Sequence, residues 1–136
     1  IIVRSAGIYG PGRHVLNWIR RGKIKNTDRY VNLIHVKDIA SLCIEALRKS
    51  KPGSTYIVSD GIPRHWSDIC QFAATKWNIE KPNPTTPKDS GKRLSPKKIL
   101  KELNYQLRHP NLYNELENIE IIERGTKNTK IKRCQL

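Results

Sequence analysis

Strand-like and helix-like segments alternate along the first eighty residues, and this alternation constrains the fold more than any other feature. Residues 1–4, 30–36 and 55–59 are rich in β-branched and aromatic side chains, which is typical of strands. Residues 39–47 and 69–77 carry apolar side chains at helical spacing. Because a strand, a helix and a second strand in this order form a parallel pairing, we predict an α/β fold.

A glycine-rich segment follows the first strand. Residues 6–13 contain three glycines and a proline, so we predict a loop without regular structure. Open α/β sheets bind ligands at the carboxyl ends of their strands, where glycine lets a ligand approach the backbone. Gly7, Ile8 and Tyr9 are therefore candidate ligand contacts, and the alternative is that the loop only turns the chain.

The rest of the chain is expected to be helical or irregular. Short helices are predicted over 14–22 and from 95 through 103. Prolines at 82, 84 and 87 predict an extended connector between the helix over 69–77 and the helix that starts at 95. A weak helix is expected over 111–123. We place a domain boundary at residue 117 and expect residues 118–136, which are rich in lysine and arginine, to be a basic disordered tail.

The charge balance indicates an anionic partner of one of two kinds. The chain has 26 basic and 12 acidic residues, a net charge of +14. A nucleic-acid-binding module is one hypothesis, although the aromatic residues are not interleaved with the basic clusters as base-stacking platforms would be. An anionic small molecule is the other, because Lys92 and Arg93 follow the flexible connector. The alternative for these two side chains is simple solvation.

We expect the side chains that could act in catalysis to have structural roles instead. His35 ends an apolar strand and is expected to be a packed, hydrogen-bonded histidine, and Asp38 is expected to cap the following helix. The three cysteines lack C-x-x-C spacing, which predicts neither a disulfide framework nor a metal site. With no apolar run of the ~20 residues that cross a bilayer, we expect a cytoplasmic protein without a membrane segment.

Four ordered segments carry a family resemblance. They are RSAGIYGPGR (4–13), NLIHVKDIA (32–40), YIVSDGIP (56–63), and the 91–110 region with GKRLS, LNY and HP. Together they resemble segments of the extended and atypical short-chain dehydrogenase/reductases, the NAD(P)-dependent epimerase/dehydratase superfamily, and in particular its nucleoside-diphosphate-sugar epimerase subgroup. The resemblance covers roughly residues 1–117, and four segments in the family's order are far more specific than any single motif.

The resemblance implies the carboxy-terminal part of such an enzyme. Residues 1–117 would supply the last strands of a Rossmann-like parallel sheet and a small, mostly helical subdomain that binds the substrate. The backbone of Gly7, Ile8 and Tyr9 would face the nicotinamide of NAD or NADP. By the same resemblance, Arg13 would reach a substrate phosphate or hydroxyl. Lys92 and Arg93 are candidate contacts to an anionic small-molecule substrate because of their charge and their place after the connector.

The family's cofactor and catalytic motifs do not occur in this sequence. It lacks the G-x-x-G-x-x-G turn, and no tyrosine is followed four positions later by lysine. We therefore expect no catalytic residue, no binding of the cofactor by this chain alone, and a separate amino-terminal Rossmann half as partner. Val31 stands where sugar-nucleotide enzymes of the family often carry arginine. The sequence leaves open a fragment, a split-gene product or a decayed remnant, and predicts an unpaired apolar edge at residues 1–3.

Overall fold

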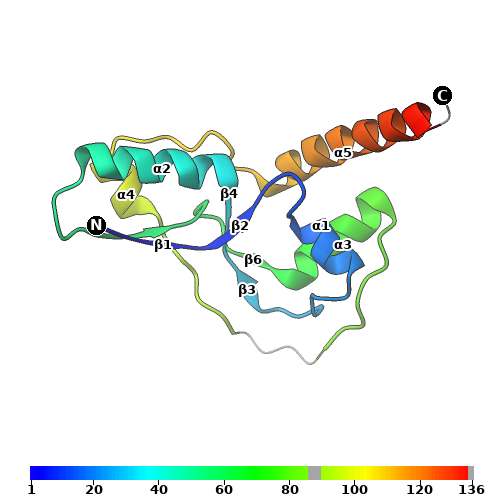
Figure 1. The fold of residues 1–136 in the computed structure, drawn as a ribbon. Coiled ribbons are helices and arrows are strands. Elements are labelled where there is room, and N and C mark those ends of the chain that lie inside the picture. Colours follow the sequence, from blue (N-terminus) through cyan, green and yellow to red (C-terminus); the bar gives the residue numbers. More distant parts are fainter. Residues whose placement is uncertain (86–89, 135–136) are drawn as a thin grey trace.

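The computed structural model describes residues 1–85 and 90–134 and confirms the α/β fold. Figure 1 shows the course of the chain. The strands are β1 (Ile2–Ser5), β2 (Gly7–Tyr9), β3 (Tyr30–Val31), β4 (Leu33–His35), β5 (Thr55–Val58) and β6 (Arg64–His65). The helices are α1 (Val15–Arg20), α2 (Val36–Lys49), α3 (Trp66–Trp77), α4 (Lys97–Glu102) and α5 (Leu112–Cys134).

Strands of the described residues pair two by two. β1 is parallel to β5, β2 is parallel to β4, and β3 is antiparallel to β6. The prediction of a single strand over 30–36 is wrong, because Asn32 divides it into β3 and β4, which pair with different partners. The two parallel pairs stay connected, since the Asp60 N–H donates to the Leu33 carbonyl oxygen at 2.8 Å.

Residues 7–9 form a strand, which corrects the loop predicted over 6–13. The Gly7 N–H donates to the Asn32 carbonyl oxygen at 3.0 Å, and Gly7 is in register with Leu33. A Cβ atom on Gly7 would lie 3.0 Å from Leu33 Cδ2 and 3.3 Å from the Asn32 carbonyl oxygen. Glycine at this position therefore permits β2 to approach β4 closely, whereas the glycine pattern predicted a loop without regular structure.

Strand β4 separates two hydrophobic cores. Successive side chains of a strand point to opposite faces. Leu33 packs in a first core with buried residues of α1, α3 and α5, while Ile34 packs in a second core with α2, α4 and β5. Figure 1 shows the same division, with α2 and α4 toward one end of the molecule and α1 and α3 toward the other.

Helix α5 is longer than the helix predicted over 111–123. It continues to Cys134, so most of the segment expected to be a disordered tail is helical, and residues 135 and 136 lie outside the described residues. Ile119 and Glu120 are buried, which shows that the first part of this segment packs against the domain. The domain boundary at residue 117 stays a prediction. No helix in the described ranges is long and apolar enough to cross a membrane.

Candidate functional site

Asn32 joins two segments that the sequence singled out separately. Its carbonyl oxygen accepts the Gly7 N–H at 3.0 Å. Its side-chain amide donates to the Lys92 carbonyl oxygen at 2.6 Å, and its Oδ1 accepts the Leu94 N–H at 2.8 Å. β2 and the 92–94 segment therefore lie on either side of one residue. Sequence reasoning assigned Asn32 no role, although it opens the NLIHVKDIA segment.

Lys92 and Arg93 lie in a segment that runs along β3. The Tyr30 N–H donates to the Ser90 carbonyl oxygen at 2.9 Å. The guanidinium of Arg93 lies over the Tyr30 ring, 5.3 Å from its centroid, which is a cation–π contact. Neither Lys92 nor Arg93 forms an ion pair with a described residue, and both are exposed. Their positive charge is therefore available to a ligand.

A basic hollow adjoins this segment. It has a volume of about 500 Å³ and is lined by Lys23, Ile24, Lys25, Thr27, Arg29, Trp66, Thr85 and Ser90. No carboxylate is among the described residues that line it. Three cations beside an aromatic ring and three hydroxyl groups suit an anionic ligand with an apolar part. Basic residues cluster in the sequence just before β3, but no binding site was predicted from them.

The described part of the predicted connector reaches the basic hollow, which Thr85 lines. Asn26 holds it in place, because its side-chain amide donates to the Pro82 carbonyl oxygen at 3.0 Å and its own carbonyl oxygen accepts the Thr85 N–H at 3.1 Å. Pro84 and Asn26 also form a bridge of the parallel type. Of the three prolines that predict the connector, Pro87 lies outside the described residues.

The three candidate cofactor contacts, Gly7, Ile8 and Tyr9, differ in whether their side chains or backbone groups are accessible to a ligand. The side chain of Tyr9 is only 1% exposed, and burial, followed by the charge of Asp60, raises the pKa of its phenol. Tyr9 therefore belongs to the first core. Because backbone N–H groups alternate between the edges of a strand and that of Gly7 faces β4, the N–H and C=O of Ile8 face the opposite edge. No strand in the described part of the chain pairs with that edge.

Arg13 closes a tight turn after β2. The Gly10 N–H donates to the Arg13 carbonyl oxygen at 2.8 Å, and the Arg13 N–H donates to the Gly10 carbonyl oxygen at 3.1 Å. Gly12 has a φ of +78°, a conformation that favours glycine. Arg13 does not line the basic hollow, and the hydrogen bonds that hold the 92–94 segment come from Asn32. Arg13 and the 92–93 pair are thus separate elements of the candidate site.

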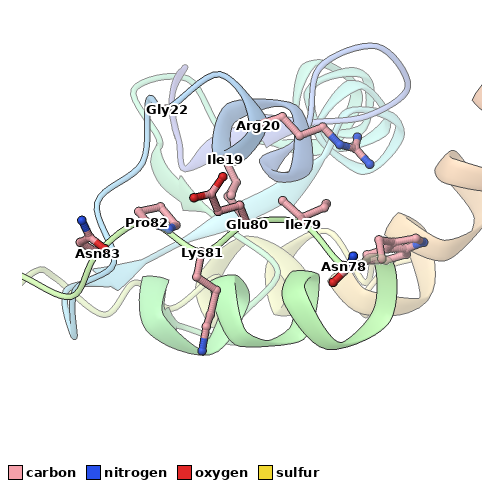
Figure 2. Close-up of a pocket in the computed structure, with 10 residues that line it drawn as sticks. Ile19, Arg20, Gly22, Asn78, Ile79, Glu80, Lys81, Pro82 and Asn83 are labelled. Atoms are coloured by element: carbon pink, nitrogen blue, oxygen red, sulfur yellow. The ribbon is translucent and has the colours of Figure 1, made fainter.

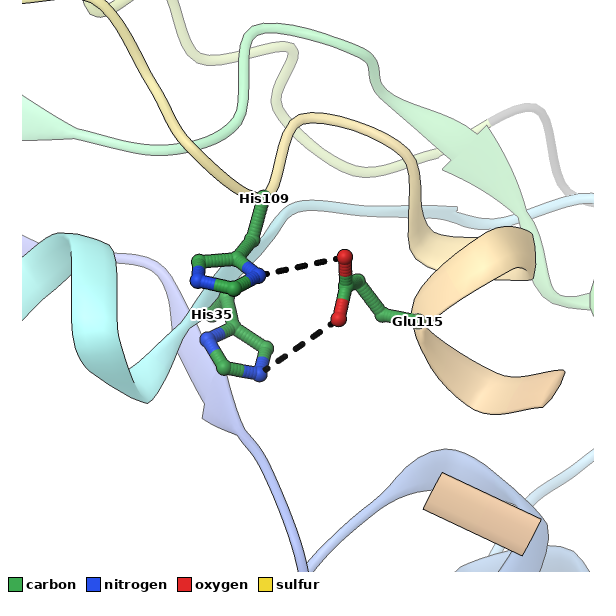
Figure 3. Close-up of side chains that lie close together, drawn as sticks. All are labelled: His35, His109 and Glu115. Atoms are coloured by element: carbon green, nitrogen blue, oxygen red, sulfur yellow. Dashed lines mark ion pairs between the residues drawn. The ribbon is translucent and has the colours of Figure 1, made fainter. Parts of the chain in front are cut away.

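His35, His109 and Glu115 form a cluster that the sequence analysis did not predict (Figure 3). The two imidazole rings stack with centroids 4.1 Å apart and an interplanar angle of 22°. Glu115 Oε1 lies 3.1 Å from His109 Nδ1, and Glu115 Oε2 lies 4.0 Å from His35 Nε2. Burial, followed by the charge of His109, lowers the pKa of His35, so this buried histidine is neutral near pH 7.

The cluster does not fit a metal ion, although histidine and carboxylate are common zinc ligands. Two histidines bind one zinc ion only when their lone pairs converge on it at ~2.0–2.1 Å. The rings of His35 and His109 are stacked and almost parallel, so their lone pairs run side by side. In addition, His35 Nδ1 accepts the Lys37 N–H at 3.2 Å, which leaves the proton of the neutral ring on Nε2.

Asp38 fixes the 105–109 segment and does not cap α2, which corrects the predicted N-cap. Its carboxylate accepts the N–H groups of Arg108 at 2.9 Å and His109 at 2.8 Å, and also the Tyr105 hydroxyl at 3.2 Å. The N-cap is His35, since α2 begins immediately after it. Asp38 therefore lies in the first helical turn, where it faces a segment seventy residues away in the sequence.

A second hollow lies at the carboxyl ends of α1 and α3 and contains none of the predicted site residues (Figure 2). Its volume is about 600 Å³. Its two cations already have partners, because Arg20 pairs with Glu120 at 2.8 Å and Lys81 donates to Gln71 Oε1 at 2.7 Å. It offers less free positive charge than the basic hollow, which we take as the candidate substrate site.

No protein-family model and no curated protein matches the chain. Solved structures do match. A putative NAD-dependent epimerase/dehydratase from Methylobacillus flagellatus is 29% identical, with a TM-score of 0.70, over 90% of this chain and 47% of that one. A functionally unknown conserved protein from Silicibacter pomeroyi DSS is 27% identical, with a TM-score of 0.71, over 88% of this chain and 48% of that one.

A third match shares the fold at lower identity. The Bordetella bronchiseptica enzyme WbmG, in complex with NAD and UDP, is 14% identical with a TM-score of 0.63, over 85% of this chain and 42% of that one. The chain thus has the fold of NAD-dependent epimerase/dehydratase structures, and the resemblance carried by its four segments is confirmed. It spans less than half the length of the structures that it matches.

Proposed function

We propose that this chain is the substrate-binding part of an NAD(P)-dependent epimerase, dehydratase or reductase. The position of Asn32 carries the proposal. Its main-chain carbonyl binds Gly7, a candidate cofactor contact. Its side chain binds the 92–94 segment, which carries the candidate substrate contacts. Both candidate contacts therefore belong to one site beside the basic hollow. A separate amino-terminal half would supply the Tyr/Lys catalytic pair.

The proposed substrate is an anionic small molecule. Lys23, Lys25 and Arg29 line the basic hollow, and the segment that follows Ser90 adds Lys92 and Arg93. Phosphate groups are recognised by such clusters of charged donors. The matched Bordetella structure holds UDP, which supports a nucleoside diphosphate as the anionic group.

The proposed cofactor of the complete enzyme is NAD or NADP, which supplies hydride transfer. The exposed edge of β2 fits a carboxamide, because the N–H and C=O of Ile8 offer one donor and one acceptor. The absence of a side chain on Gly7 leaves the adjacent backbone accessible. The buried phenol of Tyr9 has no part in this contact. We propose that these residues orient the nicotinamide while the partner half binds the rest of the cofactor.

Titration calorimetry with UDP tests the substrate site. We expect Arg29→Gln to weaken UDP binding about tenfold or more, because a charge-assisted contact to phosphate is lost. Lys51→Gln is the control, since it removes the same charge from an exposed position that lies outside the basic hollow. Equal effects of the two substitutions would mean that only net charge attracts UDP.

A basic nucleic-acid-binding module is the alternative, and the net charge of +14 favours it. The two functions differ in their salt dependence. An affinity for duplex DNA that exceeds the affinity for UDP and falls steeply with salt would support the alternative. The proposed substrate-binding function would be supported if Arg29→Gln weakens UDP binding but leaves the affinity for DNA similar to that of the wild type.

A further inference from the structure

The carboxylate of Glu123, in helix α5, holds both neighbours of Arg13. Glu123 Oε1 accepts the Gly12 N–H at 2.7 Å. Its two oxygens lie 3.3 and 3.2 Å from His14 Nε2. One side chain, more than a hundred residues away in the sequence, therefore fixes the residue before and the residue after the proposed anion contact.

The His14 ring is held through its Nε2 alone. His14 is 0% exposed, its Nδ1 has no hydrogen-bond partner among the described residues, and besides Glu123 its Nε2 contacts Asn17 Nδ2 at 3.2 Å. A second acid on the same face of α5 reinforces the attachment, because Glu120 pairs with Arg20 of α1 at 2.8 Å. Helix α5 thus fastens the turn after β2 and the start of α1 together.

Arg13 itself is left unpaired. Its guanidinium has no ion pair among the described residues, although the carboxylate of Glu123 binds the residues on both sides of it. We propose that Glu123 is a positioning residue, which holds the Gly10–Arg13 turn so that the Arg13 guanidinium is presented to an anionic substrate group. This inference rests on the proposed function and, in addition, takes Arg13 as the substrate contact that the family resemblance implies.

A purely electrostatic role and a positioning role of Glu123 predict opposite changes in anion affinity when its carboxylate is removed. Removing a carboxylate close to a cationic site raises the local positive potential, which by itself would tighten anion binding. Positioning predicts weaker binding, because the turn loses its anchor. Inorganic pyrophosphate titrated into the 136-residue chain is a suitable probe. We expect Glu123→Ala to weaken its binding at least threefold and Arg13→Gln about tenfold, the loss of a charged hydrogen bond.

Two further variants complete the test. Glu123→Gln keeps an oxygen that accepts the Gly12 N–H, so we expect it to bind pyrophosphate at least as well as the wild type. Glu117→Ala is the control, because Glu117 lies on the same helix and pairs with Lys76 at 3.1 Å, away from the turn. Combined with Arg13→Gln, Glu123→Ala should cause no additional loss, since it acts through Arg13.

Each outcome bears on the inference. Weakening by Arg13→Gln with normal or tighter binding by Glu123→Ala would overturn the role of Glu123 and leave the substrate site standing. Unchanged binding by Arg13→Gln, or no binding by the wild-type chain, would refute Arg13 as the anion contact and the inference with it. Amide exchange of Gly12 gives a readout without ligand. Unchanged protection in Glu123→Ala would also overturn the proposal.

Discussion

Leu33 and Ile34 are neighbours in strand β4, yet each is buried in a different hydrophobic core. Leu33 is 1% exposed and Ile34 is 0% exposed. Strand alternation produces this arrangement, because β4 has helices on both sides. The same strand carries His35 and directly follows Asn32. The two cores therefore fix the position of the candidate site from opposite faces.

We predict that Leu33→Ala and Ile34→Ala each lower the free energy of unfolding by about 2–5 kcal/mol, because each creates a cavity in a packed core. Urea denaturation measures the change. Ile44→Ala is the control, since Ile44 is 50% exposed on α2 and should cost far less. A small effect at either buried position would show that the corresponding core contributes little to stability.

We predict that Gly91→Ala is more damaging than Gly53→Ala. Both glycines have a positive φ, of +105° and +83° respectively, so both substitutions strain the backbone by roughly 1–2 kcal/mol. A Cβ on Gly91 would lie 2.8 Å from the Tyr30 carbonyl oxygen, whereas a Cβ on Gly53 would meet nothing within 4 Å. The clash should also displace Lys92 and Arg93 from β3.

Thermal unfolding and UDP titration distinguish the two glycine variants. Gly53→Ala should lower stability without changing affinity for UDP. Gly91→Ala should lower stability further and weaken UDP binding. Unchanged UDP affinity in a folded Gly91→Ala chain would contradict the assignment of the 92–93 segment to the substrate site.

The sequence predicted those features that depend on local pattern. β1, β5 and α2 follow from β-branched runs and helical apolar spacing, and each lies within a few residues of its expected position. The features that it missed depend on contacts distant in sequence. Asn32 interrupts a β-branched run because its side chain binds residues sixty positions later. Asp38 does not cap its helix as predicted, because its carboxylate accepts hydrogen bonds from a segment seventy positions later.

The candidate site shows the same limit. A local motif predicts Gly7, Ile8 and Arg13 as contacts, and these stay predictions, whereas Tyr9 in the same motif is a core residue. Only the fold reveals that its ring lies edge-on to His35, with centroids 5.3 Å apart. The basic cluster before β3 indicates only part of the basic hollow, and no local pattern indicates the stacked histidines, because the residues of each come from separate segments.

We predict that stability falls as the pH falls below about 6.5, the ordinary pKa of histidine. Burial lowers the pKa of His35 in the folded state, so the unfolded state binds its proton more readily between the two pKa values. The stabilisation is therefore complete above the unfolded pKa and is lost toward acid. The positive charge of His109 acts in the same direction, whereas Glu115 and Asp38 oppose it.

Urea denaturation between pH 7.5 and 5.5 measures this dependence. His35→Asn is the informative variant, because asparagine also caps helices but does not titrate. We expect it to be less stable than the wild type at pH 7.5 and to lose less stability on acidification. The same slope in both chains would assign the pH dependence to other groups.

The exposed edge of β1 leads to a prediction about association. Ile1 and Ile2 are 46% and 54% exposed, as the apolar edge predicted over residues 1–3 requires, but Val3 is partly buried against the second core. β1 pairs with β5 alone among the strands of the described residues, so its other edge keeps unpaired backbone groups. Apolar strand edges recruit other chains. We therefore expect the chain to self-associate, as measured by sedimentation velocity over a range of concentrations.

Ile2→Lys tests whether β1 is the surface responsible, because a lysine on an edge strand disfavours pairing with a second strand. Ile44→Lys adds the same charge at a position of similar exposure on α2, so it controls for general repulsion in this basic chain. We expect Ile2→Lys to shift the chain toward monomer and Ile44→Lys to leave it unchanged. Equal shifts would assign the effect to net charge, and a monomeric wild type would show that the edge does not recruit a second copy.

If the proposed function holds, co-expression with an amino-terminal Rossmann half should suppress self-association of the wild type, because the strand supplied by that half would occupy the edge of β1.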